Sequence, residues 1–580
     1  MGLRLEVLAA AVAASLPGCN GDSGTTASGK PGGPPAPAAG SRVIFRDVAR
    51  ERGVEFRHFT GFTGKRYIVE IMGSGAGFID HDQDGDFDLY LLNGAPLPGT
   101  PDPGVPPRNR FFRNDGFGSF TDVTDTARTG DEGYGMGMAV GDVENDGDPD
   151  LFVGNYGADL LFRNRGDGVF EEAGPAAGID IPGWSTSATF FDFDLDGDLD
   201  LYVAGYVDFD QVTFTPCKRS GVEVYCGPQA YGGLCDRLLR NDGTGSFADV
   251  SGELGITDCS GKGLGVVAGD FEGDGDSDLY VANDGTANFL YINHLEEGSP
   301  GFTEEAIYYG AAFGYDAVAE AGMGTDMGDY DGDLDLDITV TNLEAQTNSL
   351  YRNDGGNAVM EVSYGSGLGA STLAYVGFGT CFLDFDLDSD LDLVVANGHV
   401  IDNIALVKEG SSFEQDDLLF ENTGGSFREV LASRGGDGLP RRAGRGLAAA
   451  DIDGDGDDDV VVNNNGSQAL LLENAVGQGN PSLGLRLEGS PPESNRDAYG
   501  ARVLIEAGGR RLLREVHAGS SYLASQDPRL RVGLPGEGGP ARATIRWPSG
   551  RVEEVQGLAA GAYHLVREGV GIVESTPFRR

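Results

Sequence analysis

Residues 80–91 read DHDQDGDFDLYL, an acidic loop that runs directly into an apolar segment typical of a β-strand. Carboxylates at alternate positions repel one another unless a cation collects them. Ca²⁺ accepts six to eight oxygen ligands, and a glycine such as Gly85 permits the sharp turn that wraps these ligands around one ion. The stretch therefore predicts a calcium-binding loop followed by a strand.

The same nine-residue frame occurs seven times, each time with acidic residues at its first, third, fifth, seventh and ninth positions. The predicted metal ligands are Asp80, Asp82, Asp84, Asp86 and Asp88; Asp142, Glu144, Asp146, Asp148 and Asp150; Asp192, Asp194, Asp196, Asp198 and Asp200; Asp270, Glu272, Asp274, Asp276 and Asp278; Asp329, Asp331, Asp333, Asp335 and Asp337; Asp384, Asp386, Asp388, Asp390 and Asp392; Asp451, Asp453, Asp455, Asp457 and Asp459. Seven copies in one frame predict up to seven bound Ca²⁺ ions.

The loops are not EF-hands, because an EF-hand needs a bidentate Glu at position twelve and a helix on each side. Position twelve is apolar in all seven copies: Leu91, Val153, Val203, Val281, Val340, Val395 and Val462. Loops five and six lack the turn glycine, since Leu334 and Ser389 occupy its place, and loop five carries an early Gly332. We expect these two loops to bind calcium more weakly.

The sequence around the loops also repeats. Each repeat unit, a loop with its flanking segments, predicts four strands, the pattern of a propeller blade. A small-residue strand such as 135–141 precedes the loop, a strand and hairpin such as 160–170 follow, and a short strand such as 120–123 closes the unit. The last unit lacks this closing strand, and residues 45–48 match it. We predict an all-β chain, with a seven-bladed β-propeller over 42–478, a small β domain over 479–572 and a tail over 573–580.

These units resemble the FG-GAP, or VCBS, repeats of integrin-type propellers. Residues from about 481 resemble the ASPIC/UnbV domain, on the motifs at 495–497, 519–523 and 547–550. Together the two domains resemble the cartilage acidic protein family and its bacterial relatives. The resemblance implies extracellular calcium binding and an adhesive or matrix-like role, without established catalytic residues.

The first 19 residues predict export. An apolar run over 7–16 precedes Leu16-Pro17-Gly18-Cys19, which resembles a bacterial lipobox with Cys19 as the lipidated residue. A plain signal peptide remains the alternative. Residues 20–41 are rich in Gly, Ser, Pro and Ala and predict a flexible tether. Membrane contact is expected only through a lipid on Cys19.

The charge of the chain limits its partners. With 41 Lys+Arg against 92 Asp+Glu, the formal charge is -51, which disfavours nucleic acid. We expect a monomer with a protein or carbohydrate ligand at the cell surface. In an exported chain, the four cysteines over 217–259 can form two disulfides, and we favour Cys217 with Cys226 because one insertion holds both. Cys381 is expected to be a buried free thiol.

A second hypothesis is an enzyme, namely a hydrolase or lyase acting on carbohydrate from one propeller face. His58, Glu70 and His399 are the best candidates for an acid/base set, although they lie far apart in the sequence. The sequence contains no nucleophile elbow, HExxH motif or Walker loop. We therefore predict a binding module without catalytic residues.

Overall fold

The computed structural model describes residues 43–295, 301–434, 436–536 and 538–579. The predicted signal segment 1–19, with Cys19, and the tether 20–41 lie outside the described residues. The chain is all-β, with 40% of its residues in strands and 6% in helices. No helix among the described residues has the length and apolarity needed to cross a membrane.

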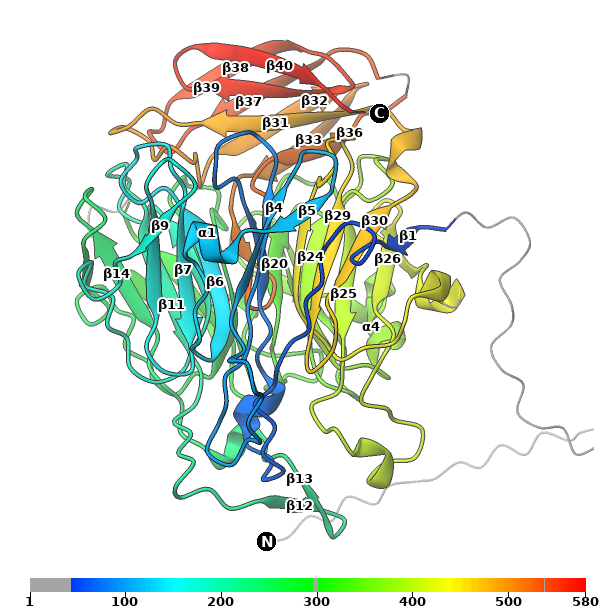
Figure 1. The fold of residues 1–580 in the computed structure, drawn as a ribbon. Coiled ribbons are helices and arrows are strands. Elements are labelled where there is room, and N and C mark those ends of the chain that lie inside the picture. The colour runs from blue at the N-terminus through cyan, green and yellow to red at the C-terminus, as the bar shows by residue number, and fades with distance from the viewer. Residues whose placement is uncertain (1–42, 296–300, 435, 537, 580) are drawn as a thin grey trace, which may run out of the picture.

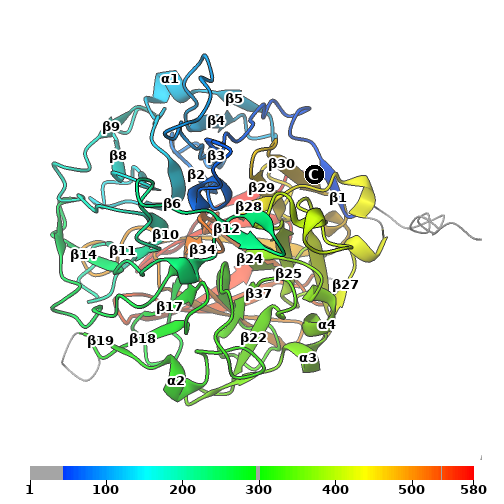
Figure 2. The same cartoon turned by 90° about the horizontal axis from the view of Figure 1, so that it is seen from below.

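Seven sheets follow one another along the described chain and surround a common axis (Figure 2). Their strands are β2 (Ala76–Ile79), β3 (Asp88–Leu91), β4 (Arg110–Asn114) and β5 (Phe120–Asp122); β6 (Gly135–Gly141), β7 (Asp150–Asn155), β8 (Leu160–Asn164) and β9 (Phe170–Glu172); β10 (Ser185–Phe191), β11 (Asp200–Gly205), β14 (Arg237–Asn241) and β15 (Phe247–Asp249); β16 (Gly263–Gly269), β17 (Asp278–Asn283), β18 (Phe289–Asn293) and β19 (Phe302–Glu304); β20 (Thr325–Gly328), β21 (Asp337–Val340), β22 (Ser349–Asn353) and β23 (Val359–Glu361); β24 (Gly377–Leu383), β25 (Asp392–Asn397), β26 (Leu418–Asn422) and β27 (Phe427–Glu429); β28 (Gly444–Ala450), β29 (Asp459–Asn464) and β30 (Leu470–Asn474) with β1 (Phe45–Asp47). We call these seven sheets the ring.

Helices are short and lie between the sheets. They are α1 (Thr124–Ala127), α2 (Ala306–Tyr309), α3 (Ser363–Ser366) and α4 (Leu368–Thr372), with 3₁₀ turns η1 (Ile68–Ile71), η2 (Pro228–Ala230), η3 (Ile404–Leu406), η4 (Ala432–Arg434), η5 (Gly436–Gly438) and η6 (Gly477–Gly479). The core is accordingly built from strand residues, which pack between neighbouring sheets.

The ends of the chain complete the seventh sheet. β1 pairs antiparallel with β30, with Phe45 opposite Asn474, and the Phe45 side chain is fully buried. This confirms the predicted role of the N-terminal strand. The first strands of the sheets contact one another in a closed series, from β2 through β6, β10, β16, β20, β24 and β28 back to β2. Each sheet stays separate, so the ring is continuous through side-chain packing and not through one closed sheet.

A repeated asparagine joins each sheet to the one before it. The residue stands at the end of the third strand, and its Nδ2 donates to the carbonyl of the second loop residue of the preceding sheet at 2.7–3.0 Å in all seven cases. Asn114 of the first sheet reaches Ile452 of the seventh at 2.7 Å. The same hydrogen bond therefore also spans the junction between the chain ends.

The C-terminal domain contains two four-stranded sheets that lie over one face of the ring (Figure 1). Their strands are β31 (Ser482–Glu488), β36 (Leu530–Gly533), β39 (Ala562–Arg567) and β40 (Gly571–Pro577), and β32 (Arg502–Ala507), β33 (Arg510–Glu515), β37 (Ala541–Arg546) and β38 (Val552–Leu558). Residues 573–577, within the expected tail 573–580, instead belong to β40, because this edge strand pairs with β39. One apolar cluster runs from the ring into this domain, so the two share a core.

A hairpin of the C-terminal domain enters the centre of the ring. It consists of β34 (Gly519–Ser520) and β35 (Ala524–Ser525), and we call residues 519–526 the plug. β35 adds to β2 as a parallel strand, and plug residues touch the first strands of all the other sheets. At its tip, the Tyr522 hydroxyl donates to the Met72 carbonyl at 2.7 Å. The plug thereby fills the axis that seven sheets leave open.

Candidate metal loops and an axial pocket

The seven acidic loops share one backbone conformation. The sixth residue has φ of 80–110° in every loop, including Leu334 at 80° and Ser389 at 87°. The fourth residue is also left-handed in every loop, and Gly332 at 81° takes this place in loop five. Gly332 therefore does not shift the turn, whereas Leu334 and Ser389 carry the side-chain strain that glycine avoids.

The ninth carboxylate is buried and ties the loop to its sheet. Its Oδ1 accepts the backbone N–H of the repeated asparagine at 2.7–2.9 Å, as between Asp88 and Asn114. Its Oδ2 accepts the N–H of the second loop residue at 3.1–3.3 Å. The sequence contained this signal, because an asparagine ends the third strand of every unit, but its role was missed.

Carboxylates of the first, third, fifth and ninth positions converge. Ligand oxygens lie within 4.8 Å of one another in the sets Asp80, Asp82 and Asp84; Asp192, Asp194 and Asp200; Asp329, Asp331 and Asp333; and Asp384, Asp386 and Asp392. The third-position Oδ1 of Asp194, Asp331, Asp386 and Asp453 is buried without a hydrogen-bond partner. Buried, unpaired carboxylate oxygens are costly unless a cation meets them, so this donor set fits a hard metal ion.

The seventh carboxylates point elsewhere in several loops. Asp198 accepts a hydrogen bond at 3.0 Å from Asn145 of the preceding loop, and Asp86 pairs with Arg579 at 2.7 Å. Asp390 pairs with Arg510. In these loops, the seventh carboxylate is already engaged by a protein partner, so fewer than the predicted five carboxylates are available for a metal ion.

Loops two and four differ because they carry Glu at the third position. Glu144 forms an ion pair with Arg163 at 2.9 Å, and Glu272 accepts a hydrogen bond from the Tyr309 hydroxyl. The longer side chain therefore brings Glu144 and Glu272 into close contact with a protein partner. The shorter Asp of loops three, five and seven lies farther from an arginine, at 3.5–4.0 Å, in the pairs Asp194 with Arg240, Asp331 with Arg352 and Asp453 with Arg52. In loops three, five, six and seven the other oxygen of this Asp is buried without a hydrogen-bond partner.

Burial and mutual repulsion govern the charge of the loops. Burial raises the pKa of Asp192 to about 8, with Asp196 and Asp194 adding repulsion. Burial also raises the pKa of Asp337 to about 9 and that of Asp384 to about 7. Burial and repulsion favour the neutral, protonated form of these carboxyls. A nearby positive charge would favour the ionised form instead.

The C-terminal domain supplies part of this charge at the first aspartate of the loops. Asp270 pairs with Arg502 at 2.8 Å, and Asp80 lies 3.4 Å from Arg486. Uncharged donors act similarly: Asp451 accepts from the Tyr563 hydroxyl at 2.8 Å, and Asp384 accepts from the Gly533 N–H at 2.9 Å. We call this covered side of the ring the loop face.

A compositional signal for this docking was present in the sequence and was missed. Residues 481–580 carry 14 arginines and 11 acidic residues, whereas the whole chain has a formal charge of -51. A weakly basic domain on an otherwise strongly acidic chain is electrostatically complementary to the acidic loops.

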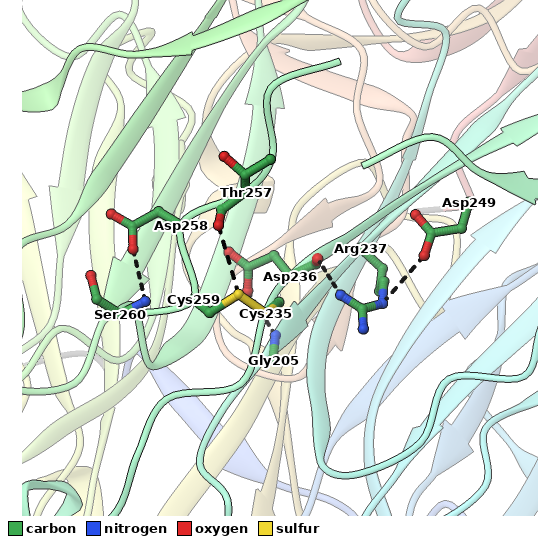
Figure 3. Close-up of a disulfide and its surroundings, with 9 residues drawn as sticks. All are labelled: Gly205, Cys235, Asp236, Arg237, Asp249, Thr257, Asp258, Cys259 and Ser260. Atoms are coloured by element: carbon green, nitrogen blue, oxygen red, sulfur yellow. Dashed lines mark hydrogen bonds and ion pairs between the residues drawn. A yellow bond between two sulfur atoms is a disulfide. The ribbon is translucent and has the colours of Figure 1, made fainter. Parts of the chain in front are cut away.

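The opposite side, which we call the axial face, carries long insertions and two disulfides. Cys217 bonds to Cys226 across the hairpin of β12 (Cys217–Arg219) and β13 (Val222–Val224). Cys235, before β14, bonds to Cys259, before β16, and so links the third sheet to the fourth (Figure 3). Cys381 is free and buried, as expected.

An axial pocket of about 410 Å³ opens on this face. The disulfide-bonded hairpin forms one wall, and His399, Val400, Ile401 and Lys408 of the sixth sheet's insertion form another. The two insertions also touch each other, since Asn403 donates to the Glu223 carbonyl at 3.0 Å and Val224 packs with Ile401 and Ile404. Figure 1 shows this hairpin projecting from the end opposite the C-terminal domain.

The three predicted acid/base residues are all buried, and only His399 lines this pocket. Burial lowers the pKa of His58 to about 3 and that of His399 to about 4. Glu70 accepts hydrogen bonds from Thr63 and from the Tyr225 hydroxyl. Among the described residues, no hydrogen bond or ion pair joins any two of these three side chains, so each serves its own local contacts.

Two family models match parts of the chain. The FG-GAP-like repeat model matches residues 80–153, 142–203 and 222–281, and the ASPIC and UnbV model matches residues 491–573. The chain combines FG-GAP-like repeats with an ASPIC and UnbV domain. The repeats cover the first four acidic loops, and the C-terminal model covers the plug and most arginines that face the loops.

Among solved structures, one similar chain is described as an Agrocybe aegerita lectin that recognises non-reducing terminal N-acetylglucosamine. It shares 14% identity over 68% of this chain and 86% of its own length, with a TM-score of 0.39. A likeness at this level carries no argument about the ligand. No curated protein matches the chain.

Proposed function

We propose that the chain is an exported, calcium-loaded seven-bladed β-propeller that acts as a ligand-binding or adhesion scaffold at the cell surface. The observation that carries this proposal is the set of buried third-position carboxylate oxygens that have no hydrogen-bond partner, in loops three, five, six and seven. Each lies in a loop whose fourth and sixth residues are left-handed, beside further carboxylates. The seven sheets around one axis support the propeller assignment.

Calcium suits these loops because it accepts several oxygen ligands in flexible geometry. The first, third, fifth and ninth carboxylates would hold the ion, and the ion would supply the positive charge that the apposed carboxylates need. The proposal allows up to seven ions. Loops two and four are the weakest candidates, since Glu144 and Glu272 already meet Arg163 and Tyr309.

In the proposed scaffold, the loop face stabilises the fold and the axial face binds the ligand. The loop face lies under the C-terminal domain, which contacts the first aspartates and fills the axis with the plug. The axial face carries the insertions and a pocket of about 410 Å³. We therefore place the ligand on the axial face, as is usual for variable insertions on a rigid framework.

Export is supported by the two disulfides, which persist in oxidising compartments. Anchoring through a lipid on Cys19, a monomeric state and kinship with the cartilage acidic protein family belong to the same proposal. A variant with Cys19→Ala should remain soluble after signal processing, whereas the natural sequence should partition into detergent. Equal partitioning of both would contradict the lipid anchor.

We propose a binding module in preference to a carbohydrate hydrolase or lyase. His58 and Glu70 do not line the axial pocket, and the buried imidazole of His58 is held neutral. General acid–base catalysis requires groups that reach the substrate, and only His399 of the three meets this need.

Metal content tests the central proposal. The purified chain is dialysed against about 1 mM calcium, and free ions are then removed. Atomic emission measures the number of calcium ions bound per chain. We expect between five and seven ions per chain, a range set by the five loops with Asp and the two with Glu at the third position. A content near zero would overturn the proposal.

A further inference from the structure

Two methionines of the axial pocket pack against the plug. Met72 and Met323 line the pocket and belong to one apolar cluster with Tyr522, whose hydroxyl donates a hydrogen bond to the Met72 carbonyl. Both methionines are nearly fully buried. The plug therefore packs behind apolar residues that line the pocket.

The walls add further apolar surface. Leu343 and Val400 line the pocket from the fifth and sixth sheets, and both are half-buried. Tyr206 and Tyr225 contribute aromatic rings whose hydroxyl groups are already used: Tyr206 donates to Asp284 at 2.7 Å, and Tyr225 donates to Glu70 at 3.0 Å. The inner pocket therefore offers apolar contacts, and its volume lies in the range of roughly 300–1,000 Å³ that suits small molecules.

The acidic groups of the pocket already have partners. Asp284 accepts from Tyr206, and Glu344 pairs with Lys408 at 3.0 Å and accepts from the Ser411 hydroxyl. His399 accepts the Ile401 N–H on Nδ1 at 2.9 Å, which places the proton of its neutral ring on Nε2. These carboxylates are therefore engaged before any ligand arrives.

The basic groups at the rim are less engaged. Arg219, on the disulfide-bonded hairpin, is exposed, and its guanidinium has no hydrogen bond or ion pair among the described residues. Lys218 lies beside it, with Glu223 at 3.7 Å in an exposed pair that contributes little. On a chain with a formal charge of -51, a pocket whose available groups are cationic donors is unusual.

We propose that the axial pocket binds a small organic anion, with its apolar body against the methionines and its anionic group at Arg219. The disulfide between Cys217 and Cys226 holds the hairpin that presents this arginine. An unpaired guanidinium is well suited to a carboxylate or sulfate, because its planar set of N–H donors matches two acceptor oxygens.

The inference deepens the proposed binding function, since it names the ligand class, and rests on it. Metal counting tests the calcium scaffold, whereas probe binding tests the pocket, so the two failures are distinguishable. A chain that holds calcium but binds no anion would leave the scaffold intact and overturn only the pocket.

Three probes of equal length test the proposal: octanoate, 1-octanol and octylammonium, each titrated into the calcium-loaded full-length chain by calorimetry. Octanoate is expected to bind at least tenfold more tightly than octylammonium, with 1-octanol between them. Arg219→Gln should weaken the binding of octanoate three- to tenfold and leave the affinity for 1-octanol unchanged. Arg113→Gln, at an exposed arginine on β4, is the matched control and should change neither.

A second pair of variants tests the apolar part. Leu343→Trp should fill the pocket and abolish binding of octanoate and 1-octanol alike. Leu406→Trp places the same side chain on the same face at a residue that is 71% exposed and does not line the pocket, so binding should persist. Absence of octanoate binding, equal affinity for octylammonium, or an unchanged Arg219→Gln variant would each overturn the proposal.

Discussion

The two faces of the ring are stabilised by different chemistry. The loop face is a layer of largely buried carboxylates that meets arginines of the C-terminal domain, and its contacts join residues hundreds of positions apart, such as Asp80 and Arg486. The axial face is held by local disulfides and by apolar contacts between insertions. We therefore expect the stability of the loop face to depend on cations and on docking of the C-terminal domain, and that of the axial face to depend on disulfides and apolar packing.

The largest expected effect is the removal of calcium, which acts on the loop face alone. A ligand at a hundred times its Kd stabilises the native state by about 2.7 kcal/mol per site, so several sites together contribute on the order of 10 kcal/mol. Chelation should lower the melting temperature markedly in scanning calorimetry. The axial disulfides should remain oxidised, as measured by thiol titration.

Magnesium at the same concentration serves as the control, since it demands a tighter octahedral shell and should restore little of the stability. A melting curve that is the same with calcium and with chelator would remove the distinction between the faces.

The second effect concerns the plug, which connects the loop face to the axial pocket. Tyr522→Ala removes a fully buried ring whose centroid lies 4.9 Å from that of Phe378. The free energy of unfolding, measured with urea, should fall by about 3–5 kcal/mol. Tyr522→Phe keeps the ring and removes only the hydrogen bond to Met72, so the free energy of unfolding should fall by about 1 kcal/mol.

The two plug variants must differ for the assignment to hold. If both lose the same stability, the hydroxyl and not the packing carries the contact. If neither loses any, the hairpin does not hold the C-terminal domain in the ring.

The third effect separates loops within the loop face. Asp331→Asn weakens a carboxylate with an unpaired buried oxygen and should reduce the metal content by one ion per chain. Glu272→Gln changes a side chain that already meets Tyr309 and should leave the metal content unchanged. Atomic emission on both variants provides the comparison, and an equal loss would mean that Glu272 is also a ligand.

The smallest effect concerns the turn. Ser389→Gly in loop six relieves the backbone strain of a non-glycine residue at φ 87°. The free energy of calcium binding should become more favourable by about 1 kcal/mol, which is roughly a fivefold gain in affinity. Leu334→Gly at φ 80° should act in the same direction in loop five. Gly85→Ala in loop one is the reverse test, and improved affinity there would contradict the argument.

Much of the loop face could be read from the sequence because its determinants are local. The nine-residue frame fixes which carboxylates share a turn, and the left-handed sixth residue follows from glycine at that place in five loops. The missing fourth strand of the last unit was also visible, since residues 45–48 match the closing strands, and β1 pairs where expected.

The groups that meet across the ring could not be predicted from the sequence. Arg502 faces Asp270, the plug threads the axis, and Arg219 and His399 line one pocket although sheets three and six carry them. Such pairs depend on how the sheets close around the axis, which no local pattern encodes. The repeats, their acidic loops and the closing strand could be predicted from the sequence, because they depend on neighbours in the chain. The structure decided the plug, the docking of arginines and the axial pocket, because these depend on the packing of distant segments.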